Sequence, residues 1–200
     1  MHPFHQGLAR YFSPNELAVL SSVTIGIAGV GGLGSNACML LARSGICHFV
    51  LVDCDRVDAS NLNRQHFFPE DIGKEKVKAM ASYLTKLNPA IEVEALPILI
   101  NEDTIDTLLP KAPIWLEALD GAQNKALFVN AALIHKAKVV SASGLGGYGG
   151  GLFSKKTLGN LVLVGDFERD IATHPPFAPR VVWASAMMCD SVLELLLGCR

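Results

Sequence analysis

The sequence predicts an α/β fold built on a doubly wound, mainly parallel sheet, with antiparallel strands near the C-terminus. Short apolar runs alternate with helical patterns as far as Ser143, and the alternation stops there. Half of the 200 residues are hydrophobic, as expected when parallel strands are buried on both faces. This length suits one domain, which we expect to span residues 1–200.

The apolar runs predict strands at 23–30, 48–52, 91–96, 113–119 and 138–143. Helical patterns lie between them, at about 35–44, 75–87, 102–109 and 122–136. Such alternation indicates βαβ units and a Rossmann-like sheet. Beyond Ser143 we expect a glycine-rich stretch at 144–151, antiparallel strands at 152–154 and 160–164, and a last apolar helix at 181–197.

A glycine-rich turn, residues 29–35, follows the first strand and precedes the first helix. Backbone N–H groups of such a turn and the positive helix end bind anions. Glycine is needed because a Cβ would block the approach of backbone to phosphate and of helix to strand. The turn predicts a nucleotide site, and dinucleotide binding is its commonest meaning.

A polar cluster, residues 53–65, follows the second strand. Asp53 ends that strand about twenty residues after the turn, where an acid can accept hydrogen bonds from ribose. Arg64 and Lys76 are either solvated surface cations or charges that stabilise a triphosphate and its departing pyrophosphate. Asp120 ends the fourth strand, and its carboxylate predicts either a Mg²⁺ ligand or the N-cap of the following helix.

The composition limits the binding partners and the cellular compartment that we expect for this protein. With 17 basic and 19 acidic residues the net charge is −2, so we expect no nucleic-acid partner. The apolar stretches are short and the N-terminal residues lack a signal pattern, so we expect no membrane span and a cytoplasmic protein. The five cysteines form no Cys-x-x-Cys pair, so we expect no zinc and reduced, core-filling thiols. They are Cys38, Cys47, Cys54, Cys189 and Cys199.

From about Leu17 to the last helix, the chain resembles the E1-like activating enzymes, in the branch of bacterial ThiF and MoeB. Ala178-Pro-Arg180 and the helix after it most resemble the short ThiF-like proteins that lack zinc. The motifs that carry the resemblance are Gly-Val-Gly-Gly-Leu-Gly-Ser (29–35), Asp53-x-Asp55, Ser60-Asn-Leu-Asn-Arg64-Gln65, Gly73-Lys-Glu-Lys76, Leu87-Asn-Pro89 and Glu117-Ala-Leu-Asp120.

The resemblance implies a homodimeric adenylyltransferase that uses Mg-ATP. Its implied substrate is the C-terminal Gly-Gly carboxylate of a ubiquitin-like sulfur carrier, most similar to the ThiS carrier of thiamine biosynthesis, and it releases pyrophosphate. Arg64 and Lys76 would neutralise phosphates, Asp53 would hold ribose, and Asp120 would hold Mg²⁺. The nucleotide-binding positions that it implies are Gly29, Gly31, Gly32, Gly34, Asp53, Asp55, Ser60, Asn61, Asn63, Arg64, Lys76 and Asp120.

The mechanism that the resemblance implies needs no protein nucleophile, because the carrier carboxylate attacks the α-phosphorus. Relatives that also transfer sulfur carry a cysteine in the loop before the last helix, and here the loop 170–180 has none. We therefore expect no covalent persulfide or thioester and place Cys189 in the core. Arg10 is a candidate to reach the partner subunit's ATP, and the stretch 146–151 either flanks a carrier tail or forms a flexible turn.

Three other functions stay open. One is an ATP-dependent dehydratase of the same superfamily that acts on a modified tRNA base, which the near-neutral charge and the absence of an evident basic extension disfavour. A second is an NAD-dependent oxidoreductase, which would need a substrate domain besides the predicted one. The third is a non-catalytic carrier-binding module, which the presence of Arg64, Lys76 and Asp120 disfavours.

Overall fold

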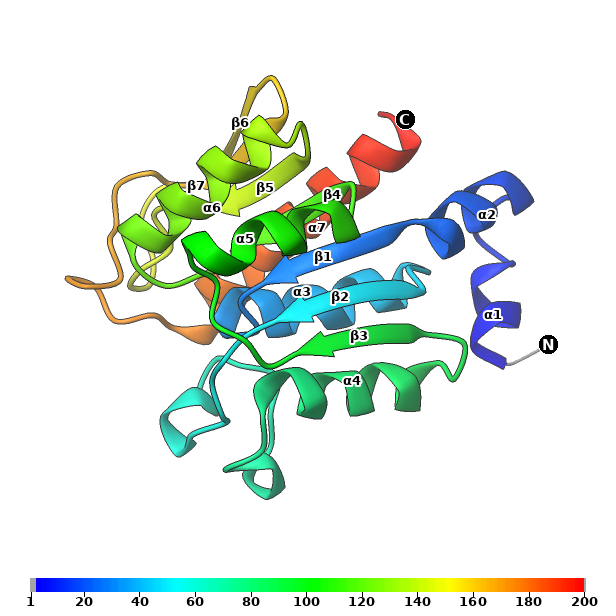
Figure 1. Cartoon of the computed structure of the whole chain (residues 1–200), viewed down its shortest axis with the longest axis horizontal. Coiled ribbons are helices and arrows are strands. Elements are labelled where there is room, and N and C mark those ends of the chain that lie inside the picture. The colour runs from blue at the N-terminus through cyan, green and yellow to red at the C-terminus, as the bar shows by residue number, and fades with distance from the viewer. Residues whose placement is uncertain (1–2, 200) are drawn as a thin grey trace.

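A computed structural model describes residues 3–199 and places seven strands in one sheet between two layers of helices (Figure 1). The helices are α1 (Pro3–Leu8), α2 (Pro14–Ser22), α3 (Gly32–Arg43), α4 (Lys76–Leu87), α5 (Glu102–Leu108), α6 (Ala122–Ile134) and α7 (Ala178–Leu197). The strands are β1 (Thr24–Ala28), β2 (His48–Val52), β3 (Glu92–Leu96), β4 (Ile114–Glu117), β5 (Lys138–Ala142), β6 (Ser154–Leu158) and β7 (Leu161–Gly165). Short 3₁₀ turns lie at Ala59–Asn61, Pro69–Asp71 and Leu109–Lys111.

The strand order, β3-β2-β1-β4-β5-β7-β6, confirms the predicted Rossmann-like class. Every neighbouring pair is parallel except β6 with β7. Those two strands form a hairpin whose two-residue turn contains Gly159 at φ 59°. Only β6 is therefore antiparallel, and it begins at Ser154, where the predicted strand 152–154 was expected to end.

The two faces of the sheet have separate apolar cores. Helices α3, α4 and α7 bury one face, while α5 and α6 cover the other (Figure 1). On the second face, Trp115 is fully buried and packs edge-on against Phe128, with ring centroids 5.4 Å apart. The Trp115 ring fills the space beside Gly26 of the neighbouring strand, and the fit requires glycine there.

The two N-terminal helices are missing from the sequence prediction. Ser13 caps α2, its hydroxyl accepting from the Glu16 backbone at 3.3 Å, and the Glu16 carboxylate accepts the Ser13 N–H at 2.7 Å. Ser13-Pro-Asn-Glu16 is a capping-box pattern, so a local signal for this helix was present in the sequence.

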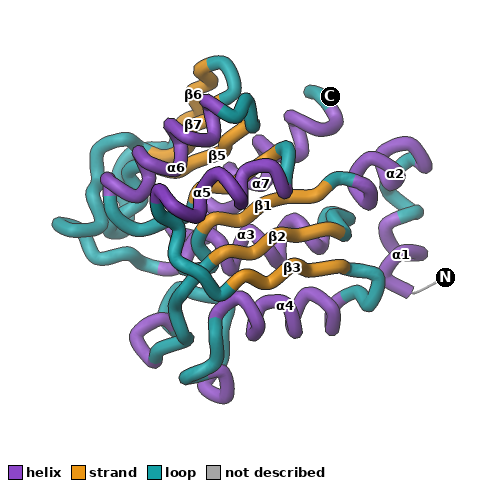
Figure 2. The backbone as a smooth tube through the Cα atoms, viewed as in Figure 1, coloured by secondary structure: helices purple, strands orange, loops and turns teal. Residues whose placement is uncertain are grey.

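The longest loops gather at the carboxyl edge of the sheet, where β1, β2 and β3 end (Figure 2). The N-terminal helices and the end of α7 lie at the opposite edge. The single-domain prediction for residues 1–200 includes Met1, His2 and Arg200, which lie outside the described residues, and it stays a prediction. No helix within residues 3–199 has both the length and the apolarity that crossing a membrane requires.

Gly26→Ala should lower the free energy of unfolding by about 1–3 kcal/mol, the usual cost of overpacking a core. The new Cβ would lie 2.3 Å from Trp115 Cδ2, and a rigid ring between two layers cannot move aside. Chemical denaturation measures the effect. Gly7→Ala is the matched control, because nothing lies within 4 Å of its Cβ position and a helical alanine is favoured. Equal stabilities of the two variants would contradict this packing argument.

Candidate active site

Strands β1 and β4 are neighbours whose following helices cover opposite faces, so the sheet has its topological switch point between them. Ligands bind at this point in open α/β sheets, outside the carboxyl ends of the strands. A cleft of about 220 Å³ lies there. It is lined by Gly29, Gly31, Val52, Asp53, Cys54, Asp55, Lys76, Ile98, Leu99, Ile100, Ala118, Leu119, Asp120 and Asn124.

The glycine turn holds its shape through two close approaches of backbone. Gly29 has φ 91°, and a Cβ placed on it would lie 2.6 Å from the Ala118 carbonyl oxygen. A Cβ on Gly34 would lie 1.9 Å from the Gly29 carbonyl oxygen, because α3 folds directly back onto the turn. These two glycines therefore serve packing, as the sequence argument requires of helix-to-strand contacts.

Gly31 has a different role, because it leaves open space at the first turn of α3. It is the N-cap of α3, with no side-chain cap, and the nearest atom to its Cβ position is Gln65 Nε2 at 3.8 Å. The buried Gln65 Oε1 has no hydrogen-bond partner among the described residues. Uncapped backbone N–H groups in open space suit the phosphates of ATP. Gln65 belongs to the recognised motif but was not predicted as a site residue.

The Asp53 carboxylate ties the glycine turn to the segment that follows β2. One oxygen accepts the Val30 N–H at 2.7 Å and the other accepts the Asp55 N–H at 2.8 Å. Burial raises the pKa of Asp53, opposed by these bonds and by Lys76. Each carboxylate oxygen has lone pairs left for a ribose hydroxyl, so the predicted ribose role stays compatible with the structure.

Lys76 is the first residue of α4 and is buried at the cleft. Its side chain is 7% exposed, and its ammonium lies 2.7 Å from Asp55 Oδ2. The Asp55 backbone carbonyl also accepts the Lys76 N–H at 3.0 Å. Asp55 therefore fixes the ammonium beside the phosphate cradle, where a charge-assisted bond to an anion is strongest.

Arg64 lies beside the cleft and does not line it. Its guanidinium donates to the Ser60 carbonyl at 3.1 Å and to Asn63 Oδ1 at 2.9 Å, and its stem lies 3.6 Å from the Gly32 Cβ position. Asn36, which was not predicted, donates to the carbonyls of Gly32 and Arg64 at 2.7 and 2.9 Å. Arg64 is thus held at the first turn of α3.

The other predicted residues of this segment build its loop. Ser60 and Asn61 close a cap with Asp58, which accepts the Ser60 hydroxyl at 2.6 Å and donates its N–H to Asn61 Oδ1 at 3.1 Å. Gly32 and Gly34 lie in the first turn of α3, and the other predicted residues separate into two groups. Gly29, Gly31, Asp53, Asp55, Lys76 and Asp120 line one cleft, whereas Ser60, Asn61, Asn63 and Arg64 form the adjacent loop.

Asp120 is exposed at the cleft, and no hydrogen bond to its carboxylate exists within residues 3–199. The N-cap of α6 is Gly121 at φ 81°, so the alternative role of Asp120 as a helix cap is wrong. Its role as a Mg²⁺ ligand stays a prediction, as does the absence of zinc. The ligand-type cluster found among the described residues is Asp53, Cys54 and Asp55, whose carboxylates already bind backbone N–H groups and Lys76.

Glu117 braces the loop that carries Asp120, and the sequence analysis missed this role. It is fully buried and accepts the Leu119 N–H at 2.7 Å, Lys125 Nζ at 3.0 Å and Ser141 Oγ at 2.5 Å. A buried carboxylate is stable only with such partners. An acid inside the apolar run 114–119 was the available signal.

Two cysteines lie in the core, two are exposed, and Cys47 is partly buried. Cys38 and Cys189 are buried, and burial raises the pKa of both thiols, which agrees with the core role expected for Cys189. Cys54 and Cys199 are exposed, so the prediction of a core position is wrong for these two. Cys54 lies two residues beyond the end of β2, where the chain has left the buried strand and lines the cleft.

Two arginines hold the glycine-rich stretch 146–151. Arg169 donates to the carbonyls of Tyr148 and Gly149 at 2.9 and 3.3 Å. The buried Arg180 donates to the Gly149 carbonyl at 2.6 Å and to Asp166 at 2.5 Å. Arg10 comes two residues after α1, a helix at the edge of the sheet opposite the longest loops (Figure 1), and its role toward a partner subunit's ATP stays a prediction.

Comparison with known proteins gives a family and a set of relatives. A family model described as "ThiF family" matches residues 5–158. The tRNA threonylcarbamoyladenosine dehydratase of Bacillus subtilis is 42% identical over 107 residues, covering 50% of this chain and 42% of that protein. The Haemophilus influenzae protein of the same name is 32% identical over 143 residues, covering 70% and 55%. The chain thus spans about half the length of the curated relatives it matches.

One solved structure shares the fold almost throughout. It is the Escherichia coli tRNA N6-threonylcarbamoyladenosine dehydratase in complex with AMP, with a TM-score of 0.86, 21% identity, and coverage of 96% of this chain and 93% of that chain. The same protein has been solved in complex with ATP.

These relatives overturn the principal function expected from the sequence. They are named as tRNA dehydratases, so the expectation of ThiS carrier adenylation in thiamine biosynthesis is wrong. The expectations of a carrier partner and of no nucleic-acid partner are wrong for the same reason. The quoted motifs were read as nucleotide-binding positions and carry no information on what is activated, and a net charge of −2 does not describe the local arrangement of charge.

Gly31→Ala and Gly34→Ala should separate phosphate binding from packing. Gly31→Ala should keep the free energy of unfolding within about 1 kcal/mol and lose ATP affinity about tenfold or more, the cost of losing hydrogen bonds to a charged group. Gly34→Ala should lose stability by about 1–3 kcal/mol or more, because its Cβ meets backbone. Calorimetric titration and denaturation measure both. If Gly31→Ala binds ATP with full affinity, the phosphates of ATP do not bind at this turn.

Proposed function

The chain belongs to the ThiF family, and from this premise we propose that it is an ATP-dependent dehydratase acting on a carboxylate-bearing modified adenosine of tRNA. The observation that carries the proposal is the similarity to two curated tRNA threonylcarbamoyladenosine dehydratases. The geometry supports it with an uncapped helix end, a buried lysine and three carboxylates around one cleft.

The chemistry of the proposed reaction is removal of water from a carboxylate. A carboxylate oxygen forms a bond to the α-phosphorus of ATP while the bond from that phosphorus to pyrophosphate breaks. An internal nucleophile of the same modified base then displaces AMP from the acyl carbon. The oxygen of the lost water leaves in AMP, so no protein nucleophile and no redox partner are needed.

The residues of this chain would act by position and charge. The N–H groups at the start of α3 and the Lys76 ammonium would bind the phosphates and stabilise the charge that develops on pyrophosphate. Asp53 would accept a ribose hydroxyl while holding the glycine turn. Asp120 would hold Mg²⁺, which supplies further neutralisation of phosphate charge when bound. The homodimer stays a prediction.

Purified protein incubated with Mg-ATP and tRNA that carries threonylcarbamoyladenosine should convert the base to a product lighter by the mass of one water. Mass spectrometry of the digested nucleosides measures this conversion, and AMP and pyrophosphate should appear in equal amounts. Omitting ATP, or replacing it with NAD, should abolish the product. If the protein binds ATP but does not convert the modified base, the dehydratase proposal is wrong.

Asp120→Asn should lower the rate of this conversion by about 10²-fold, on the scale of removing one electrostatic interaction from a transition state. The thermal midpoint should not change, because the carboxylate is exposed and carries no hydrogen bond within the described residues. Asp190→Asn, an exposed aspartate on α7, controls for the loss of one charge. A rate equal to that of the control would exclude Asp120 as the metal ligand.

A further inference from the structure

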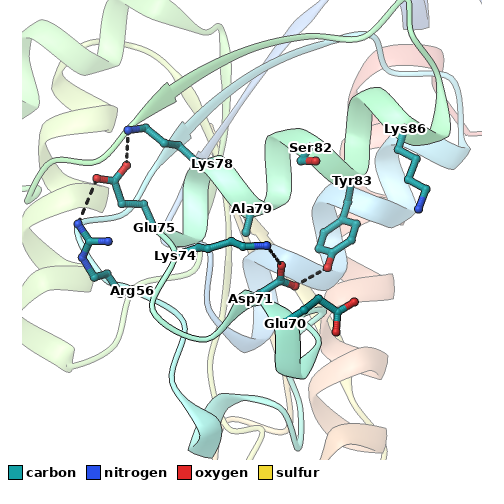
Figure 3. A pocket seen from close by; sticks show the side chains of 10 residues that line it. All are labelled: Arg56, Glu70, Asp71, Lys74, Glu75, Lys78, Ala79, Ser82, Tyr83 and Lys86. Carbon is teal, nitrogen blue, oxygen red and sulfur yellow. Dashed lines mark hydrogen bonds and ion pairs between the residues drawn. The ribbon is translucent and has the colours of Figure 1, made fainter.

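A second, larger hollow lies on the outer side of α4, away from the nucleotide cleft. It has a volume of about 540 Å³ and lies between α4 and the segment 56–75 (Figure 3). We call it the α4 groove. It is lined by Arg56, Glu70, Asp71, Lys74, Glu75, Lys78, Ala79, Ser82, Tyr83 and Lys86.

Hydrogen bonds hold the segment that forms one wall of the α4 groove. Arg56 and Glu75 form an antiparallel bridge, and the backbone bonds between Val57, Gly73 and Lys74 close the neck of the segment at 2.8 Å each. Asp71 anchors the far end, because it accepts from the Tyr83 hydroxyl, from Lys74 at 3.0 Å and from the Phe68 N–H at 3.0 Å (Figure 3).

The two paired acids of the groove are recessed and their cations face solvent. Asp71 is 4% exposed and Glu75 is 21% exposed, whereas Arg56, Lys74 and Lys78 are 55–66% exposed. Burial opposes ionisation of Asp71, but its three hydrogen bonds outweigh burial and hold its pKa below the usual range. The Lys78 hydrogen bond likewise lowers the pKa of Glu75. Both acids stay ionised and hold the cations in place.

Two charges of the groove are left unbalanced. Lys86 has no ion-pair partner within the described part of the chain, and its ammonium points away from the other labelled side chains (Figure 3). Among the three acids that line the groove, only Glu70 is exposed to solvent, and its negative charge reduces the positive charge of the groove surface. The lining holds four cations and three acids, so the surface presented to solvent is positive.

The exposed groups follow the axis of α4 in a regular row. Lys78, Ser82 and Lys86 are four residues apart, which places successive Cβ atoms about 5–6 Å from each other on one side of a helix. Ammonium, hydroxyl and ammonium groups in line suit successive phosphates of a nucleic-acid strand. The row starts two residues after Lys76, so the groove and the nucleotide cleft adjoin the same end of α4.

We propose that the α4 groove binds the phosphate backbone of the substrate RNA beside the nucleotide cleft. The proposal rests on the proposed function, which supplies an RNA partner, and names the surface that holds it. A row of cations along one helix also favours one orientation of the bound strand.

Binding of a tRNA transcript to Lys78→Gln/Lys86→Gln, measured over a series of salt concentrations, tests the proposal. We expect about a tenfold loss of affinity at low salt, and a slope of log K against log salt that is smaller by about 2, one for each phosphate that is no longer neutralised. Glu70→Gln should bind more tightly than the unmodified protein, which loss of folding cannot imitate. ATP affinity should be unchanged in all of these variants.

Lys136→Gln/Lys138→Gln is the matched control, because it removes the same charge next to the start of β5, a strand that β1 and β4 separate from β2 in the sheet. If the unmodified protein binds no tRNA, the RNA partner of the proposed function fails. If it binds tRNA and both double variants keep the same affinity and slope, the groove proposal alone is overturned. A groove variant that changes the mass of the protein in solution, with RNA binding intact, would instead assign this face to contact between copies of the chain.

Discussion

The carboxylate of Asp53 is the connection on which the candidate site depends. With one oxygen it holds the Val30 N–H at the exit of β1, and with the other it holds the Asp55 N–H beyond β2. Asp55 in turn fixes the buried ammonium of Lys76 at the start of α4. One short acidic segment thus sets the relative positions of two strand ends and two helix starts, and the cleft takes its shape from that chain of contacts.

Glu117 plays the corresponding part on the other side of the switch point. Its carboxylate accepts the Leu119 N–H and pairs with Lys125, so it fixes the loop that leads from β4 to Asp120. Both carboxylates lie at the ends of parallel strands, where backbone N–H groups lose their strand partners. Satisfying these groups with an acid gives local rigidity and places negative charge near a site for a cation and a polyphosphate.

Most of the fold could be predicted from the sequence because it depends on local signals. The apolar runs indicate a parallel sheet, which is found, and the glycine turn at 29–35 lies between β1 and α3 as expected, while its binding of phosphate stays a prediction. The contacts of Asn36 with Arg64 and of Glu117 with Ser141 could not be predicted, since they join segments distant in sequence, although the acid at 117 inside an apolar run was a signal that was missed. Helix α2 was predictable from its capping box and was missed. The substrate was misread because the motifs of the cleft describe the nucleotide that they surround.

The bridge between Arg56 and Glu75 closes the segment 56–75 into an insert between β2 and α4. The insert contacts two helices, because Asn36 of α3 donates to its Arg64 carbonyl and Tyr83 of α4 donates to its Asp71. A substitution within the insert can therefore shift the start of α3 and the wall of the groove together. Any change made there to alter the groove has to be measured at the nucleotide cleft as well.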